Sequence, residues 1–96
     1  QAHAKLVAAS PAANAAGPAP KVITLKFNEK LQPKFSGFAL TSGGAPVAVK
    51  VTVGKDKLSL IGAPARPLAT GAYEVKWHAV TADTHRMQGA YAFTVR

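Results

Sequence analysis

An aspartate and a histidine two positions apart are the residues of this chain best suited to chemistry. Asp83 and His85 enclose Thr84 in a polar, turn-like stretch, residues 80–89. In an extended backbone, residues i and i+2 project to the same side, so this carboxylate and imidazole can converge on one ion. The same pattern also fits a plain surface turn in which Asp83 caps backbone N–H groups and His85 is exposed. The spacing permits metal chelation without requiring it.

A further histidine, His3, lies close to the N-terminus and is the other candidate metal ligand. The chain has no cysteine, so disulfides, thiolate metal sites and thiol nucleophiles are excluded. We expect His78 to be a surface or edge imidazole on the strand face opposite Trp77. We expect Met87, the single methionine, to be a core side chain rather than a ligand. The sequence has no hydroxyl with a base beside it and no Gly-rich phosphate loop, which disfavours nucleophilic hydrolysis.

The charge balance of the chain is strongly basic. Twelve Lys and Arg residues against four Asp and Glu residues give a formal net charge of +8. Such a charge favours polyanions by electrostatics alone. The basic residues, however, are scattered singly, without an arginine cluster or interleaved exposed aromatics. We therefore expect a solvated basic surface and no nucleic-acid binding. Because acids are scarce in this basic chain, each carboxylate is a candidate for a specific role.

The elements that must position these residues are strands. Residues 21–27 alternate, with Ile23, Leu25 and Phe27 on one face, as a half-buried strand does. The same pattern recurs over residues 35–41, 47–53, 57–61, 73–79 and 91–95. Gly43-Gly44 and residues 54–56 read as hairpin-like connections, and residues 11–20, rich in proline, read as an ordered surface loop.

Six or seven short strands without any helical period predict an all-β fold, a small Greek-key β-barrel or sandwich. With 96 residues, the chain has room for a single domain, residues 1–96. Its core must depend on few large side chains, and we expect these to be the four Phe, the Trp, the two Tyr and the aliphatic residues of the alternating segments.

Several motifs together resemble the CopC family of periplasmic copper-binding proteins. They cover nearly the whole chain: an N-terminal His followed by Leu6 and Ser10-Pro11, Phe-x-Glu at 27–29, Phe-Ser-Gly at 35–37, Pro-Leu-x-x-Gly-x-Tyr-x-Val-x-Trp at 67–77, and Val-x-x-Asp-Thr-His at 80–85. The resemblance implies a cupredoxin-like or immunoglobulin-like β-barrel that holds one Cu(II) ion. It also implies that His3, through its α-amine and imidazole, binds the metal together with Asp83 and His85. Whether Glu29 also contacts the metal stays open.

The chemistry of these donors agrees with that metal. Nitrogen and oxygen ligands in a tetragonal plane select Cu(II), with Ni(II) the second choice. Many relatives carry a methionine-rich insertion for Cu(I) near Leu40. In this chain the segment that follows Leu40, residues 41–46, is short and contains no Met. We therefore expect a Cu(II) protein that lacks the Cu(I) site.

The resemblance further implies a location and a role. We expect a periplasmic protein whose signal peptide has been removed, acting in copper homeostasis and resistance as a carrier or buffer. We expect a monomer that is not an enzyme, and its partners would be the copper ion and an inner-membrane copper permease. Two other classes stay open: an oxygenase with a copper brace, and a metal-free β-sandwich interaction domain.

The residues ahead of His3 complicate the expected N-terminus. Gln1 and Ala2 would be a leader remnant if the mature chain begins at His3. If Gln1 is retained, its α-amine, two deprotonated amides and the His3 imidazole can form an X-x-His chelate for Cu(II) or Ni(II) instead. The sequence leaves both arrangements open.

Overall fold

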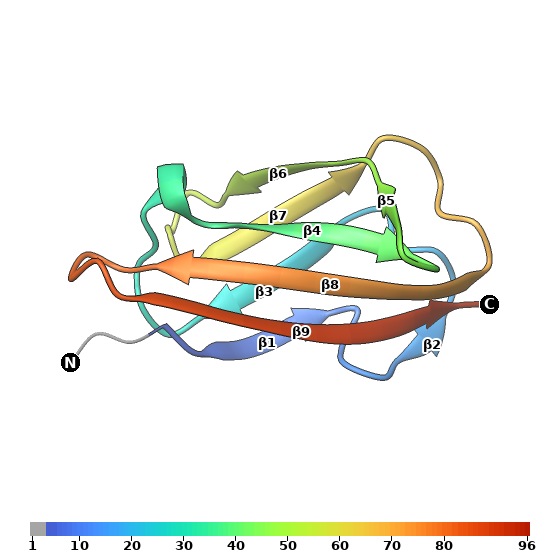
Figure 1. Cartoon of the computed structure of the whole chain (residues 1–96), viewed down its shortest axis with the longest axis horizontal. Helices are drawn as coiled ribbons and strands as arrows, with labels where there is room; N and C mark the ends of the chain where they lie inside the picture. The colour runs from blue at the N-terminus through green and yellow to red at the C-terminus, as the bar shows by residue number, and fades with distance from the viewer. Residues whose placement is uncertain (1–3) are drawn as a thin grey trace.

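Residues 4–96, the part of the chain that the computed structural model describes, form two β-sheets packed face to face (Figure 1). One sheet has four strands in the order β1 (Leu6–Ser10), β3 (Ile23–Phe27), β7 (Ser59–Pro64) and β6 (Val49–Val53). The other has five, in the order β2 (Ala16–Gly17), β9 (Arg86–Val95), β8 (Gly71–Val80), β4 (Gly37–Ser42) and β5 (Ala45–Val47). A short 3-10 helix, η1 (Pro33–Phe35), precedes β4.

The all-β prediction is confirmed, and its sandwich form is the correct one. The hydrogen-bonded strands of residues 4–96 form two separate sheets, so the sheet does not close into a barrel. The Greek-key connectivity stays a prediction. No helix within residues 4–96 is long and apolar enough to cross a membrane.

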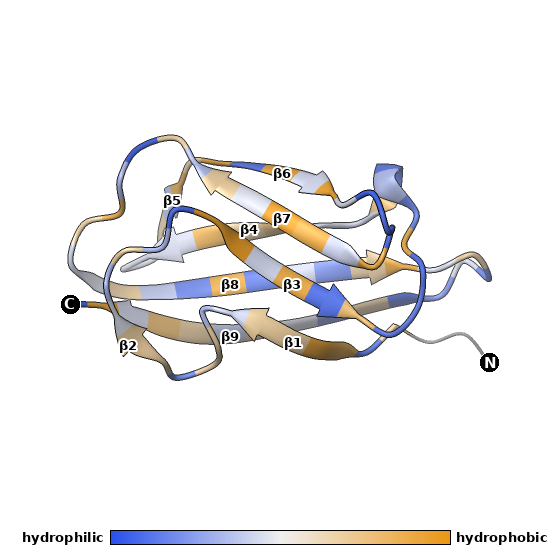
Figure 2. Ribbon diagram, turned by 180° about the vertical axis from the view of Figure 1, so that it is seen from behind, coloured by the Kyte–Doolittle hydropathy of each residue, from blue (hydrophilic) through white to orange (hydrophobic). Residues whose placement is uncertain are grey.

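The core lies between the two sheets and follows the alternation of the sequence. Figure 2 shows apolar and polar residues alternating along β3. The inward side chains of β3 are at most 1% exposed, and they share one buried cluster with side chains of β8 and β9 from the other sheet, such as Val75 and Phe93. Phe27 contacts Trp77 edge to face, with ring centroids 5.1 Å apart, and Tyr73 stacks on Phe93 at 5.4 Å. The Phe27–Trp77 pair therefore joins the two sheets, whereas Tyr73–Phe93 is a cross-strand pair of β8 and β9 within one sheet.

Phe35 contradicts the sequence-based expectation. The predicted strand 35–41 begins at Gly37, and Phe35 instead ends η1 with 56% of its surface exposed. The reason is Pro33, which fixes its own φ and has no N–H for a ladder, so that the chain turns before the strand begins. Three of the four phenylalanines are therefore core residues, and Phe35 is not.

The β8–β9 hairpin carries the segment with the candidate ligands. Its strands pair in antiparallel register over ten positions, from Gly71 opposite Val95 to Val80 opposite Arg86. The turn predicted over residues 80–89 is therefore too long, because β9 begins at Arg86. The backbone ladder continues past the point where the apolar alternation of the sequence stops, since β8 offers pairing partners up to Val80.

The β4–β5 connection is as short as a hairpin allows. Ser42 pairs with Ala45, and the two residues between them, Gly43 and Gly44, have φ values of 58° and 81°. Two left-handed residues in succession are the requirement of a type I′ turn, which glycine meets without strain. The predicted hairpin at Gly43-Gly44 is thus confirmed, and this connection holds no insertion.

Candidate metal centre

The candidate ligands lie in the turn between β8 and β9, at one end of the sandwich. Figure 1 shows this turn at the same end as η1, the last residues of β3 and the start of the described chain. The backbone joins these segments directly. Leu31 forms a bridge with Thr81, and the Gln32 N–H donates to the Val80 carbonyl at 2.8 Å. The turn is therefore anchored to the rigid end of the sheet.

The turn is closed by short-range backbone hydrogen bonds. The Thr84 N–H donates to the Thr81 carbonyl at 2.9 Å, and the Thr81 N–H donates to the His85 carbonyl at 3.3 Å. Thr84 has a φ of 67°, in the left-handed region that β-branched residues disfavour. Tight hairpin loops often need one residue in this conformation. The backbone at Thr84 is therefore strained in the conformation that brings His85 to the Asp83 carboxylate.

The Asp83 carboxylate organises the turn through one of its oxygens. Oδ1 accepts a hydrogen bond from the Thr81 hydroxyl at 2.6 Å and one from the His85 N–H at 3.1 Å. The second bond, from a backbone N–H two residues on, is the turn-capping contact that aspartate makes in loops. Thr81 is itself 1% exposed, so its hydroxyl is fixed by the surrounding core.

The other carboxylate oxygen faces the imidazole. Asp83 Oδ2 lies 3.2 Å from His85 Nδ1, and both side chains are partly exposed. Bonds of about 2 Å to one metal ion place two neighbouring donors about 3 Å apart. The observed separation therefore suits both a hydrogen bond and joint binding of one ion. The capping and chelating roles considered from the sequence use different oxygens and are compatible.

Hydrogen bonding holds the Asp83 carboxyl in its charged form. The pKa of Asp83 is lowered to about 2, first by the Thr81 hydroxyl and next by the His85 N–H, with smaller contributions from the His85 side chain. Desolvation opposes these contributions, and it is smaller than the two main hydrogen bonds but larger than either contribution of the His85 side chain. A metal-binding carboxylate must be deprotonated, so this turn meets that requirement well below neutral pH.

The third predicted ligand, His3, lies outside the described residues. The description begins at Ala4, which is buried, and Lys5 is tied to the loop after β3 by two hydrogen bonds with Asn28, at 2.7 Å and 3.2 Å. The chain that adjoins His3 in sequence is therefore fixed at the same end as the β8–β9 turn. Within residues 4–96, no third acid or histidine joins Asp83 and His85 in a cluster, and Glu29 is no exception.

The remaining predicted residues take the following places. His78 is half-buried on β8, and Met87 packs against the core from β9, as expected of a core side chain. Sequence reasoning missed Thr81, the strongest partner of the Asp83 carboxylate. Its only signal was a hydroxyl two residues before the aspartate, which also occurs in ordinary turns.

Comparison with known proteins shows the family. The CopC domain model matches residues 6–96. Copper resistance protein C of Escherichia coli is 43% identical over 99% of this chain and 82% of its own length. The protein of the same name from Pseudomonas syringae pv. tomato is 41% identical over 100% and 82%. The chain belongs to the CopC family.

Solved structures agree with this assignment. PcoC of Escherichia coli, described as a methionine-rich copper resistance protein, superposes with a TM-score of 0.93 at 44% identity, over 99% of this chain and 100% of its own. CopC from Methylosinus trichosporium OB3b gives a TM-score of 0.87 at 33% identity, over 97% and 93%. The two-sheet architecture is therefore that of the family.

Proposed function

We propose that this chain is a periplasmic copper-binding protein that holds one Cu(II) ion through His3, Asp83 and His85. It acts in copper homeostasis and resistance as a carrier or buffer, not as an enzyme. The observation that carries the proposal is the 3.2 Å approach of Asp83 Oδ2 to His85 Nδ1. The names of the relatives, copper resistance proteins, supply the metal.

The donor set supports the divalent state. A carboxylate and imidazoles are hard to borderline ligands and suit Cu(II), whereas Cu(I) prefers thiolates and thioethers. The chain has one methionine, Met87, and it packs against the core. The β4–β5 connection, where a methionine-rich insertion would stand, is the two-residue turn at Gly43 and Gly44. We propose that the chain binds Cu(II) and lacks the Cu(I) site.

The position of the described N-terminus supports the third ligand. Ala4 is buried and Lys5 is tied to Asn28, at the end of the sandwich that carries Asp83 and His85. An N-terminal His3 would contribute both its α-amine and its imidazole. Two bonds from one residue offset the entropy cost of ordering the chain end.

The role of carrier follows from the openness of this arrangement. Asp83 and His85 are partly exposed, so an ion held there can exchange with a partner without unfolding the sandwich. We propose an inner-membrane copper permease as that partner and a monomeric protein in the periplasm. A carboxylate in the coordination plane also removes the position that a copper oxygenase keeps for oxygen, which supports a non-enzymatic role.

A Cu(II) competition titration of the purified protein tests this function. We expect one equivalent to bind, and His85→Ala to lower the affinity by about tenfold or more, as the loss of a ligand should. Affinity should fall as the pH drops through the titration range of imidazole, because protons compete for the same nitrogens. His78→Ala is the matched control and should leave the affinity unchanged. An unchanged affinity in His85→Ala would disprove the site.

A further inference from the structure

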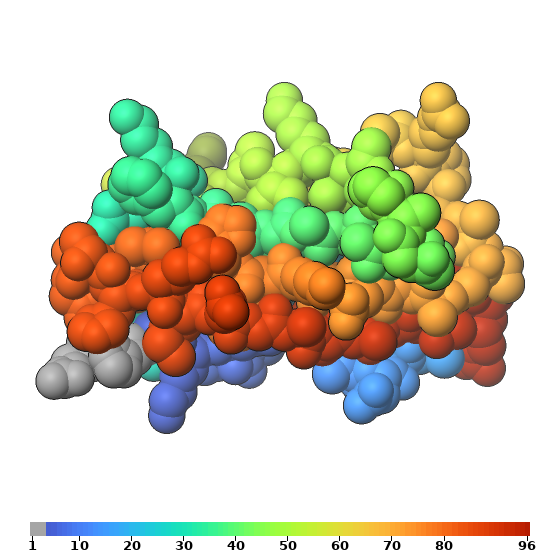
Figure 3. Space-filling model, in the orientation of Figure 1, coloured from blue at the N-terminus to red at the C-terminus, as the bar shows by residue number. Residues whose placement is uncertain are grey.

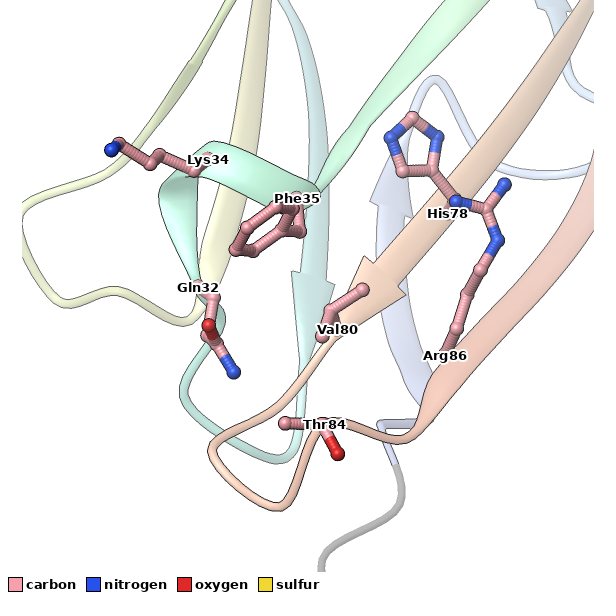
Figure 4. A pocket seen from close by; sticks show the side chains of 7 residues that line it. All are labelled: Gln32, Lys34, Phe35, His78, Val80, Thr84 and Arg86. Carbon is pink, nitrogen blue, oxygen red and sulfur yellow. The ribbon is translucent and has the colours of Figure 1, made fainter.

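A hollow of about 560 Å³ opens beside the metal-binding end, between η1 and the β8–β9 hairpin. Figure 4 shows the Phe35 ring on one side of it and the Arg86 guanidinium beside the His78 imidazole on the other, with Val80 between them. Figure 3 shows η1 and the tip of the hairpin side by side on this face of the molecule. The hollow thus combines an aromatic ring and a lysine from η1 with an arginine from β9.

Phe35 is an exposed aromatic residue on a segment of backbone that hydrogen bonds hold in place. It is 56% exposed, yet its N–H donates to the Gln32 carbonyl at 3.1 Å, and Gln32 is tied to the end of β8 through both its backbone and its side chain. On the other side of Phe35, the Ser36 hydroxyl accepts a hydrogen bond from the Val80 N–H at 3.0 Å. Because the backbone under Phe35 is fixed, little backbone entropy is lost when the exposed ring is buried by a partner, which suits an interface hot spot.

The charged side chains that line the hollow are cationic. Arg86 and Lys34 line it, and none of its described lining residues is acidic. Glu74, an acid of the same strand as His78, does not line the hollow, and its Oε1 forms an ion pair with Lys76 Nζ at 3.7 Å. The pKa of His78 is lowered, first by burial and then by Arg86, so its imidazole is neutral near neutral pH and available for hydrogen bonding. Arginine and aromatic residues are both enriched at protein interfaces.

A second hollow continues the first along the outer face of the five-stranded sheet. It has a volume of about 610 Å³ and shares His78 and Arg86 with the first. Small side chains, Ala39 and Ala90, line it where β4 and β9 flank β8. Two hollows that meet at an arginine make an elongated surface. A short stretch of polypeptide fills such a surface, whereas a small carboxylic acid fills only one half.

We propose that this surface, the Phe35–Arg86 face, docks an acidic segment of a partner protein. A carboxylate of the segment pairs with Arg86, and an apolar side chain next to it packs in the hollow against Phe35 and Val80. Thr84 lines the same hollow, so the docked segment lies beside the Asp83–His85 turn. The proposal does not depend on copper and is tested in the metal-free protein.

Fluorescence anisotropy with a labelled peptide, Gly-Glu-Glu-Phe-Asp-Glu-Gly, tests the proposal. We expect saturable binding that weakens with added salt. A peptide with Gln and Asn in place of the acids, and one with Gly in place of Phe, should each bind about tenfold more weakly. Equal binding of either control peptide would overturn the proposal, because charge and apolar contact are both required.

Variants of the protein locate the binding surface. Phe35→Ser and Arg86→Gln should each lower the affinity by about fivefold or more. Val22→Ser and Arg66→Gln are the matched controls, since Val22 is also an exposed large apolar residue and Arg66 lies outside both hollows. Thermal unfolding of all four variants checks that the fold is kept. Because the four substituted side chains are exposed, we expect the midpoint temperatures to change little. Equal losses in the control variants would indicate general attraction to a cationic chain and would overturn the proposal.

Two further experiments distinguish a protein partner from a membrane surface, and the docking face from the copper site. Binding to phosphatidylglycerol vesicles that is lost in Phe35→Ser, without any binding of the peptide, would assign the face to a membrane and reject a protein partner. His85→Ala should keep the peptide affinity of the unchanged chain. Failure of copper binding with peptide binding intact would therefore refute the proposed function alone, and the reverse result would refute the docking face alone.

Discussion

The strands of the β8–β9 hairpin and the turn that joins them are held by different forces. The strands form ten register pairs, and they carry buried inward side chains such as Val75 and Phe93, which are at most 2% exposed. The turn has partly exposed side chains and is held by hydrogen bonds to the Asp83 carboxylate. The comparison teaches that apolar burial fixes the fold, whereas a few polar contacts shape the candidate site. Substitutions in the core should therefore lower the free energy of unfolding strongly, whereas substitutions in the turn should change it far less and act mainly on the Asp83 carboxylate.

Phe27→Ala should break the core most strongly. Phe27 is 1% exposed and meets Trp77 edge to face at 5.1 Å. Removing a buried phenyl ring costs about 3–5 kcal/mol in the free energy of unfolding, which urea denaturation measures. Val22→Ala, at a position that is 45% exposed, is the control and should cost far less. A similar cost in both variants would contradict the assignment of Phe27 to the core.

Gly89→Ala should disturb the point where β9 passes under Trp77. A Cβ atom at this position would lie 2.6 Å from Cζ2 of the Trp77 ring, closer than carbon atoms approach. We expect a loss of about 1–3 kcal/mol in unfolding free energy, as overpacking costs, together with a shift in tryptophan fluorescence. Gly17→Ala, where nothing lies within 4 Å of the added Cβ, should show neither change. An unshifted Trp77 spectrum would refute this packing.

Thr84→Asn should act in the opposite direction, because it relieves strain in the turn. Thr84 has a φ of 67°, and asparagine tolerates this conformation better than a β-branched residue does. We expect a gain of about 1 kcal/mol or less in unfolding free energy. Thr94→Asn, at an exposed position within β9, should bring no gain. If both variants lose stability equally, the turn carries no strain of this kind.

Thr81→Val should alter the turn with the smallest effect on the fold. It keeps the shape of a buried side chain and removes the hydroxyl that donates to Asp83 Oδ1, so the pKa of Asp83 should rise from about 2 toward its ordinary value. Carboxyl NMR titration measures this shift, and Thr52→Val on β6 should leave the pKa in place.

The same variant has a consequence for acid stability. A carboxyl whose pKa is lowered by folding stabilises the protein above the pKa of the unfolded chain, and this contribution is lost as the pH falls through the folded value. The difference in unfolding free energy between the unchanged chain and Thr81→Val should therefore shrink between about pH 4 and pH 2. A difference that is constant over this window would contradict the role given to Thr81.

The strands could be predicted from the sequence because one buried face imposes a period of two. Ile23, Leu25 and Phe27 follow that rule and are buried. Where backbone pairing alone decides, the pattern fails: β9 begins at Arg86 because β8 continues opposite it. Phe35 also escaped prediction, since the 3-10 turn set by Pro33 overrides the apolar character of the side chain.

The pair Asp83 and His85 of the candidate site was predictable from sequence spacing, whereas the hydrogen bond from Thr81 was not. The i, i+2 spacing predicted that Asp83 and His85 project to the same side of the chain, and their side chains lie 3.2 Å apart, although the backbone between them is not extended but left-handed at Thr84. The Thr81 hydroxyl could not be assigned to Asp83 without the turn geometry, because its approach depends on the left-handed conformation at Thr84 and on the bridge to Leu31. His3 stays a prediction that rests on the family resemblance.

Electron paramagnetic resonance of the Cu(II)-loaded protein tests the site most directly, using chains that begin at Gln1 and at His3, each with and without Asp83→Ala. In the chain that begins at His3, we expect Asp83→Ala to change the spectrum and to lower Cu(II) affinity by about tenfold or more. In the chain that begins at Gln1, the α-amine of His3 is lost to a peptide bond, so the affinity should drop or the spectrum should become that of a four-nitrogen X-x-His chelate. Insensitivity to Asp83→Ala in both chains would contradict a copper site built on the β8–β9 turn.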